Sequence, residues 1–267
     1  IMSLSNEINN KFWLDPPWGD GHKKYRLGLA PIDKEDWFET DISSDLKEHK
    51  RRLLETRYED VVATTDDSAE AQSILSEKIS TSENEFPDQI ANISLSVPDD
   101  LCVIESHGNQ RLIAASVCSP SYWDLTKKIG KSLRDIHKPV KTLNKKIGSP
   151  IEKFINNAPL NKPFKRENWF IHGNDKRFYL EPEGWPKEPI ERWYVRSERE
   201  TICKYNEAYS LFAINVRFQP LSIIKNYSEA RLGLIKSLEG FDEKEIDYFG
   251  GIKKYDALLK HLHSMQL

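Results

Sequence analysis

Residues that could do chemistry are concentrated in three short stretches of the sequence, each set among aromatic and aliphatic residues. The first is residues 118–123, and His137 follows it beyond a basic stretch. The second is residues 166–169, and the third is residues 196–201, which interrupts a strand-like pattern with charges. Imidazole, guanidinium and carboxylate groups can bind metals, pair with anions and move protons. Charges inside a strand either face solvent or line a polar site.

Each of these candidates also has an ordinary structural interpretation. His137 could bond the backbone carbonyls at the end of a helix. Arg196, Glu198 and Glu200 share one strand face, which is also typical of a solvated edge with weak ion pairs. Trp169 could simply lie in the core. The residues alone therefore leave a functional and a structural interpretation open.

The motifs of several large enzyme classes are missing. The sequence contains no Gly-x-Gly-x-x-Gly, no Gly-x-x-x-x-Gly-Lys-Ser/Thr, no Gly-x-Ser-x-Gly and no His-Glu-x-x-His. Its three cysteines are isolated and lack Cys-x-x-Cys spacing, which disfavours a disulfide framework and a zinc site. These absences disfavour Rossmann dehydrogenases, P-loop nucleotidases, the usual α/β-hydrolases and zincins.

The composition is that of a folded protein. The chain has 267 residues, of which 38% are hydrophobic and 10% aromatic, more than a disordered chain carries. Its net charge of −3 gives no basic excess, so we expect no nucleic-acid partner. The most apolar stretches, residues 112–118 and 211–216, are far shorter than the ~20 residues that cross a bilayer, so we expect no membrane span. The start has no basic-then-apolar secretory pattern, which predicts a cytoplasmic location.

The elements that must position the candidates begin with helices. Residues 41–56 place apolar residues on one face and charged residues elsewhere, which predicts a helix. Asp67, with Glu70 three residues later, predicts a capping box at the start of a second helix. Residues 80–88 are polar and form the one plausible loose connection in this half of the chain.

Strand patterns and one longer helix surround the first candidates. Residues 101–105 and 112–117 are rich in β-formers and flank His-Gly-Asn-Gln, in which Gly and Asn can supply the positive φ of a hairpin turn. Residues 122–133 have helical spacing, and Pro139 favours a helix end near His137.

The second half of the chain returns to strands and closes with helices, which indicates an α+β fold. We expect one domain over residues 1–267, with a mainly helical part in residues 1–90, a sheet core in residues 91–220 and C-terminal helices in residues 221–267. The further strands expected are residues 168–172, 192–205 and 209–218, and the further helices are residues 150–158, 222–238 and 252–263.

Short motifs in these stretches together resemble the haem-dependent oxidative N-demethylase family, from about Arg26 to the C-terminus. Each motif is short, but their order and spacing make the set specific. The motifs are Gly28-Leu29-Ala30-Pro31 followed by Trp37 and Asp41, Cys118-x-Pro120-Ser121-x-Trp123, Lys128-x-Gly130, Ile136-His137-x-Pro139-Val140, Arg166-x-Asn168-Trp169, Arg196-x-Glu198-Arg199-x-Thr201 and Tyr248-x-Gly250.

The resemblance implies a PAS-like antiparallel sheet with flanking helices that hold haem b. It also implies an enzyme that oxidatively demethylates a small secondary amine such as dimethylamine and releases formaldehyde. Dioxygen would be the oxidant, and redox partner subunits or a reductase would supply electrons. The cofactor would carry the chemistry at iron, while the protein would supply a ligand, anchors and a pocket. A haem-binding PAS-like sensor or carrier without turnover, and an apo structural homologue, are the alternatives.

Roles for individual residues follow from this resemblance. His137 is the expected axial ligand of the iron, because neutral imidazole binds iron well and Pro139 would hold the end of its helix. His172 is the alternative ligand. Arg134, Lys128 and Arg166 are the expected partners of the haem propionates, since cationic side chains pair with carboxylates.

The resemblance also implies catalytic residues near the iron. Arg196 or Arg199 would donate hydrogen bonds to oxygen or its reduced forms. Glu198 and Tyr122 would orient the amine or relay protons.

Two tryptophans, Trp123 and Trp169, would pack against the macrocycle or support the pocket wall. The sequence departs from the family pattern at three positions. Ser119 replaces an aromatic residue, Lys141 stands where a second proline often follows, and Glu200 replaces a glutamine. The extra negative charge of Glu200 could hold the neighbouring arginine in an ion pair and away from a ligand.

Overall fold

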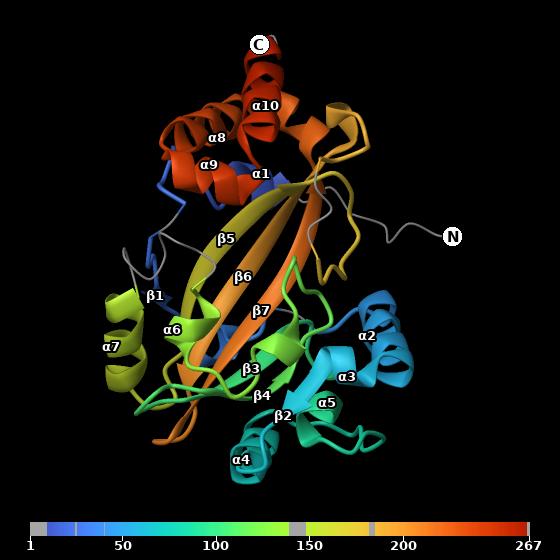
Figure 1. The fold of residues 1–267 in the computed structure, drawn as a ribbon, viewed down its shortest axis with the longest axis vertical. Coiled ribbons are helices and arrows are strands. Elements are labelled where there is room, and N and C mark those ends of the chain that lie inside the picture. The colour runs from blue at the N-terminus through green and yellow to red at the C-terminus, as the bar shows by residue number, and fades with distance from the viewer. Residues whose placement is uncertain (1–9, 25, 40, 139–147, 182–184, 266–267) are drawn as a thin grey trace.

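A seven-stranded antiparallel sheet, with strand order β1-β5-β6-β7-β3-β4-β2, forms the centre of the computed structural model. The structure describes residues 10–24, 26–39, 41–138, 148–181 and 185–265. The three longest strands, β5, β6 and β7, run side by side through the molecule (Figure 1). The strands are β1 (Ala30–Pro31), β2 (Val62–Thr64), β3 (Asp100–Glu105), β4 (Leu112–Ser116), β5 (Phe164–His172), β6 (Tyr194–Lys204) and β7 (Tyr209–Pro220).

Helices cover both faces and one end of this sheet. The C-terminal helices and the short helix Asn10–Leu14 group at one end, while the helices within residues 44–94 lie near β2 and β4 (Figure 1). No helix in the described parts of the chain has the length and apolarity needed to cross a bilayer. The helices are α1 (Asn10–Leu14), α2 (Ser44–Thr56), α3 (Tyr58–Val61), α4 (Ala69–Lys78), α5 (Gln89–Ser94), α6 (Leu133–Ile136), α7 (Ser149–Asn157), α8 (Ser228–Glu239), α9 (Glu243–Phe249) and α10 (Ile252–Ser264).

Strand alternation divides the sheet residues between two faces. On one face, Cys102 and Ile202 pack with Ile136 of α6 and with residues of α7; we call this the α6 face. On the other face, Leu101 and Ala213 pack against α2, α4 and α5; we call this the α2 face. Buried residues therefore occur on both sides of β6, unlike an antiparallel strand with one wet face.

The predicted strands and the α+β class are confirmed. The predicted hairpin is β3–β4, and the three later strands are β5, β6 and β7, with β5 beginning earlier than expected. The positive φ angles of the hairpin turn fall on Gly108 (63°) and Gln110 (51°), not on Asn109. The first 90 residues, expected to be mainly helical, also supply β1 and β2, which are the two edge strands.

The helix expected over residues 122–133 is wrong. Only a 3₁₀ turn at Leu125–Lys127 and the short α6 form there. The reason is pairing with β4: the Gly130 N–H donates to the Leu112 carbonyl, and the Leu112 N–H donates to the Lys131 carbonyl. These bonds use backbone groups that a helix would need internally.

Two other helix expectations change at their beginnings. Residues 222–238 divide into a 3₁₀ helix at Leu221–Asn226 and α8. The expected capping box at Asp67 is absent, because Ser68 is the residue that precedes α4 and the Asp67 carboxylate binds Thr65 and Arg111 instead. The helices expected at residues 41–56, 150–158 and 252–263 are confirmed as α2, α7 and α10.

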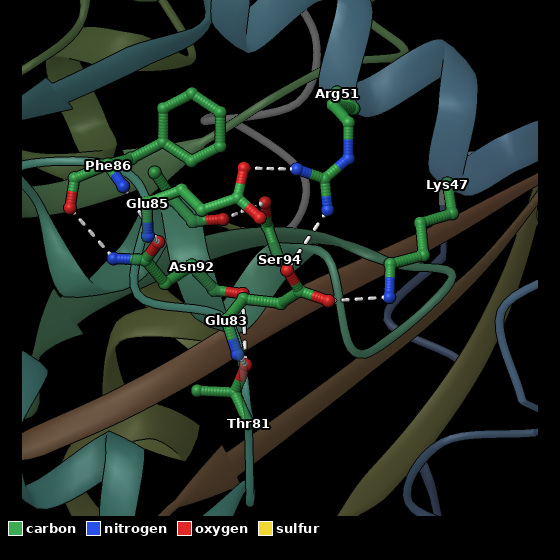
Figure 2. Close-up of polar contacts among 9 residues, drawn as sticks. Lys47, Arg51, Thr81, Glu83, Glu85, Phe86, Asn92 and Ser94 are labelled. Carbon is green, nitrogen blue, oxygen red and sulfur yellow. Dashed lines mark hydrogen bonds and ion pairs between the residues drawn. The ribbon is translucent and has the colours of Figure 1, made fainter.

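The polar stretch 80–88 is not a loose connection. Figure 2 shows its acidic side chains turned toward α2, where Glu83 accepts from Lys47 at 2.6 Å and from Arg51 at 3.0 Å. The buried side chain of Asn92 accepts from the backbone N–H groups of Glu85 at 2.9 Å and Phe86 at 3.0 Å. The Asn92 side chain of α5 thus satisfies backbone N–H groups that have no helix or strand partner in this stretch.

The segment before β1 packs against the C-terminal helices. Trp18 is fully buried, and its Nε1 donates to the Ala230 carbonyl of α8 at 2.7 Å. Gly233 of α8 lies against the same segment, since a Cβ there would stand 2.1 Å from the carbonyl oxygen of Gly19. This close approach requires glycine at position 233.

We expect Gly233→Ala to lower the free energy of unfolding by about 1–3 kcal/mol, because the added methyl group forces the segment away from α8. Urea unfolding followed by circular dichroism measures the change. Gly240→Ala is the matched control, since its Cβ would meet the Ser237 carbonyl oxygen at 3.4 Å, an ordinary contact. Equal losses in the two variants would contradict the proposed close packing.

Candidate functional site

A row of polar residues lies on the α6 face where β5 and β6 pair. The register sets Arg166 opposite Glu200 and Asn168 opposite Glu198, while Arg196 follows opposite Phe170. We call Arg166, Asn168, Arg196, Glu198 and Glu200 the β5–β6 polar row. Its members project to one face because residues two apart on a strand share a side.

The row is connected by hydrogen bonds and ion pairs. Arg196 is 1% exposed, donates to the Glu198 carboxylate and also reaches the Ser119 carbonyl at 2.5 Å. Asn168 Nδ2 donates to Glu198 Oε2 at 2.9 Å. Arg166 Nε lies 3.1 Å from Glu200 Oε2. Buried charges need such partners, because an unpaired charge in a low dielectric is costly.

The two carboxylates of the row differ in their protonation. Burial raises the pKa of Glu200 to about 7; the Arg166 charge opposes this rise, and the Glu198 charge adds to it. Burial alone would also raise the pKa of Glu198, but the charge and hydrogen bond of Arg196 hold it below its ordinary value. Glu198 is therefore an anion at neutral pH, while Glu200 titrates there.

His137 lies near the Arg166 end of the row, just after α6. Burial, with contributions from the charges of Arg166 and Lys128, lowers the pKa of its imidazole to about 4. The ring is therefore neutral at pH 7, and it makes no hydrogen bond to another described residue. A neutral imidazole with cations beside it and no hydrogen bond among these residues can act as a metal ligand.

The surroundings of His137 combine apolar and basic groups. Trp123 packs, half-buried, with the cluster that contains Ile136 and Ile202. Lys128 Nζ lies 3.5 Å from the Ile136 carbonyl, and burial lowers the pKa of this lysine. An apolar wall with two cations at its border suits a flat hydrophobic ligand that carries carboxylates.

His172 lies at the opposite end of the row, and its ring makes more contacts with described residues than the ring of His137 does. Its Nε2 lies 3.1 Å from the Ser121 hydroxyl, and its ring stacks on Tyr122 with centroids 5.4 Å apart. Burial lowers the pKa of His172 to about 2, with contributions from the Arg196 and Lys254 charges. Tyr122, which has a φ of 56°, also lies beside the Tyr179 ring, with centroids 5.8 Å apart.

Three expected site residues lie away from the row. Arg199 projects to the α2 face, where it donates to the carbonyls of Asp36 (2.5 Å) and Trp37 (3.1 Å), whereas Arg196, the other expected donor to oxygen, lies in the row. Because Arg199 projects to this other face, its expected pairing with Glu200 is wrong. Arg134 is exposed and forms a two-pronged pair with Glu152 of α7, at 2.9 and 2.7 Å. Trp169 is 2% exposed and lies in the core beside Trp18, with ring centroids 5.5 Å apart.

Lys24 joins the row, although no sequence pattern indicated this position. Its ammonium donates to Asn168 Oδ1 at 2.7 Å and to the Trp169 carbonyl. It also lies 3.9 Å from the Phe170 ring centroid. Lys24 stands in an irregular segment without periodicity, so only the tertiary fold brings it to β5.

Two of the cavities that described residues line include neither His137 nor the β5–β6 polar row. One, of about 430 Å³, lies between the β3–β4 turn and α7 and includes Arg134. The other, of about 520 Å³, lies between residues 185–193 and α10. Pro139 and Lys141, which the sequence placed next to His137, fall outside the described residues.

One family model matches most of the chain. It describes proteins like the alpha subunit of haem-dependent oxidative N-demethylase and covers residues 46–259. That range includes His137, Lys128 and the whole β5–β6 polar row, whereas Lys24 and β1 precede it. No curated protein matches the chain.

The low pKa of His172 predicts how stability depends on pH. The ordinary pKa of histidine is 6.5 and the pKa of His172 in the folded protein is about 2. At a pH between these two values, the His172 imidazole is protonated in the unfolded chain but not in the folded protein. The free energy of unfolding should therefore fall as the pH falls below 6.5, by about 1.4 kcal/mol per pH unit from this residue. Urea unfolding of the protein at several pH values between 6.5 and 4.5 measures the slope.

His172→Phe should lose that part of the slope, because phenylalanine does not titrate. His107→Phe is the matched control at an exposed position and should keep the original slope. An unchanged slope in His172→Phe would show that His172 is accessible to protons in the folded state.

Proposed function

The chain belongs to the haem-dependent oxidative N-demethylase, alpha subunit-like family, and from this we propose that it binds haem and demethylates a small secondary amine oxidatively. The family description supports a haem-dependent oxidative enzyme and the presence of partner subunits. Haem b as the cofactor, the PAS-like description of the sheet and a dimethylamine-like substrate are the finer parts of the proposal.

The neutral, mostly buried imidazole of His137 is the observation that carries the proposal. If haem is bound here, His137 would supply the nitrogen by which the protein holds the iron, because a neutral imidazole binds iron well. A pKa of about 4 keeps this nitrogen unprotonated at any pH near neutrality. His172 fits less well, because its Nε2 is beside the Ser121 hydroxyl and its ring is stacked on Tyr122.

The charges around His137 fit the rest of the cofactor. Lys128 and Arg166 are close enough to lower the pKa of His137, so propionates of a haem bound there would meet two cations. Trp123 and the apolar residues of the α6 face would pack against the macrocycle. Arg134 is engaged with Glu152 and is a weaker candidate for this role.

The β5–β6 polar row supplies groups for the amine. A small secondary amine is a cation near neutral pH, and the anionic Glu198 carboxylate would attract and orient it. Glu200, with a pKa of about 7, can hold or accept a proton in the working pH range. Arg196, fixed by Glu198 and the Ser119 carbonyl, keeps a positive charge at the same place.

The overall reaction then balances as follows. The secondary amine, one dioxygen, two protons and two electrons give the primary amine, formaldehyde and water. A bound haem would supply the redox-active iron for this oxidation, and partner subunits or a reductase would supply the electrons. The residues of this chain would bind the amine, exclude water and hold protons at the carboxylates.

Haem binding is the first test. Titration of the haem-free protein with haemin should give a Soret absorption band, and His137→Ala should weaken binding by at least about tenfold or reshape the band. His172→Ala is the matched control and should retain the band. Loss of the band in His172→Ala but not in His137→Ala would assign the iron ligand to His172. The absence of any Soret band in the unaltered protein would contradict the proposal.

Amine turnover is the second test. With dioxygen and a chemical reductant, the haem-loaded protein should release formaldehyde from dimethylamine, and the amine should perturb the haem spectrum. Glu198→Gln should lower kcat/KM by about 100-fold, because the neutral amide cannot attract the cationic amine. Glu207→Gln, at an exposed turn, is the control. Haem binding without formaldehyde release would favour a sensor or carrier.

A further inference from the structure

The amino-terminal segment delivers a buried cation to the β5–β6 polar row. Lys24 is 8% exposed and precedes the range that the family model matches. Its ammonium donates to Asn168 Oδ1 and the Trp169 carbonyl, and it lies over the rings of Trp169 and Phe170, at 4.9 and 3.9 Å from their centroids. Burial lowers the pKa of Lys24 to about 7, and the charge of Glu198 opposes this fall. Two acceptors and two aromatic faces also favour the protonated ammonium, so Lys24 carries its charge below about pH 7.

These contacts fix which way the Asn168 side-chain amide points. Lys24 Nζ donates to Asn168 Oδ1 at 2.7 Å, and the Trp169 N–H donates to the same oxygen at 2.9 Å. An amide has its acceptor and its donor on opposite arms, so the oxygen must face these two donors. The Nδ2 arm is thereby left to donate to Glu198 Oε2, at 2.9 Å.

We infer that Lys24 is a positioning residue for Glu198, because it locks the Asn168 amide in the orientation that donates to this carboxylate. Its charge also stabilises the ionised form of Glu198, so that the carboxylate stays anionic and fixed when it meets the amine. This inference rests on the proposed function for the role of Glu198. The amide orientation and the carboxylate charge can each be measured without turnover.

Several charged groups surround Glu198 and share in this effect. Arg196 lies on its own strand, and Arg166 pairs with Glu200 across the β5–β6 register. Lys254 of α10 bonds the Ile171 carbonyl at 2.5 Å, and its charge acts on Lys24. The negative charge of Glu198 also raises the pKa of Tyr248 in α9, in addition to the effect of burial. Lys24 differs from these charged groups because its ammonium donates directly to the Asn168 oxygen.

The first experiment uses the haem-free protein. Carboxyl carbons of labelled glutamate are followed by NMR against pH, with Glu198→Gln to assign the Glu198 signal. Lys24→Met keeps the length of the side chain but removes its charge and donors, so the pKa of Glu198 should rise and the Asn168 side-chain amide signals should shift. Lys24→Arg restores the charge and should return both signals toward their original values. Lys23→Met, at the exposed neighbouring lysine, should change neither.

The second experiment is a double-mutant cycle on kcat/KM for dimethylamine. Lys24→Met should cost about tenfold alone but less than about twofold when Glu198 is already glutamine, because its effect passes through that carboxylate. Equal costs in both backgrounds, or an unchanged pKa of Glu198 in Lys24→Met, would overturn the inference. If Lys24→Met does not fold, Lys24→Arg must still preserve the Glu198 pKa and the Asn168 signals, and a change in both overturns it.

The two failures are separable. If the unaltered protein releases no formaldehyde, the proposed function fails. The NMR signals of Glu198 and Asn168 still decide in that case whether Lys24 positions Glu198.

Discussion

The structure depends on pairing charges that the sheet buries between helices. Because helices cover both faces of β6, its arginines and glutamates lie in low-dielectric surroundings, where an unpaired ion is costly. Arg196 with Glu198, and Arg166 with Glu200, meet this requirement on the α6 face. The same pairing leaves one carboxylate firmly ionised and its neighbour with a pKa near neutrality, which is the condition for binding and moving protons.

The two faces of the sheet serve different purposes. On the α2 face, the Arg199 guanidinium donates to the backbone carbonyls of residues 36 and 37. These hydrogen bonds hold an irregular segment against the sheet. On the α6 face, the imidazole of His137 lies between apolar side chains and two cations, and the ring makes no hydrogen bond to another described residue. The first arrangement stabilises the fold, and the second is the proposed place of the haem.

The candidate site combines parts of the chain that are far apart in sequence. Lys24 comes from the segment packed on α8, His137 follows α6, and the β5–β6 polar row belongs to the central sheet. The packing of Trp18 and Gly233 therefore bears on the site, because it fixes the path of the segment that carries Lys24. The same segment therefore packs on α8 and carries Lys24 to Asn168 in the β5–β6 polar row.

The sequence by itself determined the strands, the α+β class and the family, because alternation, turn residues and ordered motifs are local signals. It also placed Arg196 and Glu198 on one strand face. Only the tertiary structure decided that this face is buried, since burial depends on which helices cover the sheet. It likewise decided that Glu200 pairs with Arg166 rather than Arg199, and that an ammonium from an irregular segment reaches β5. Register and chain path are long-range properties, which no local pattern encodes.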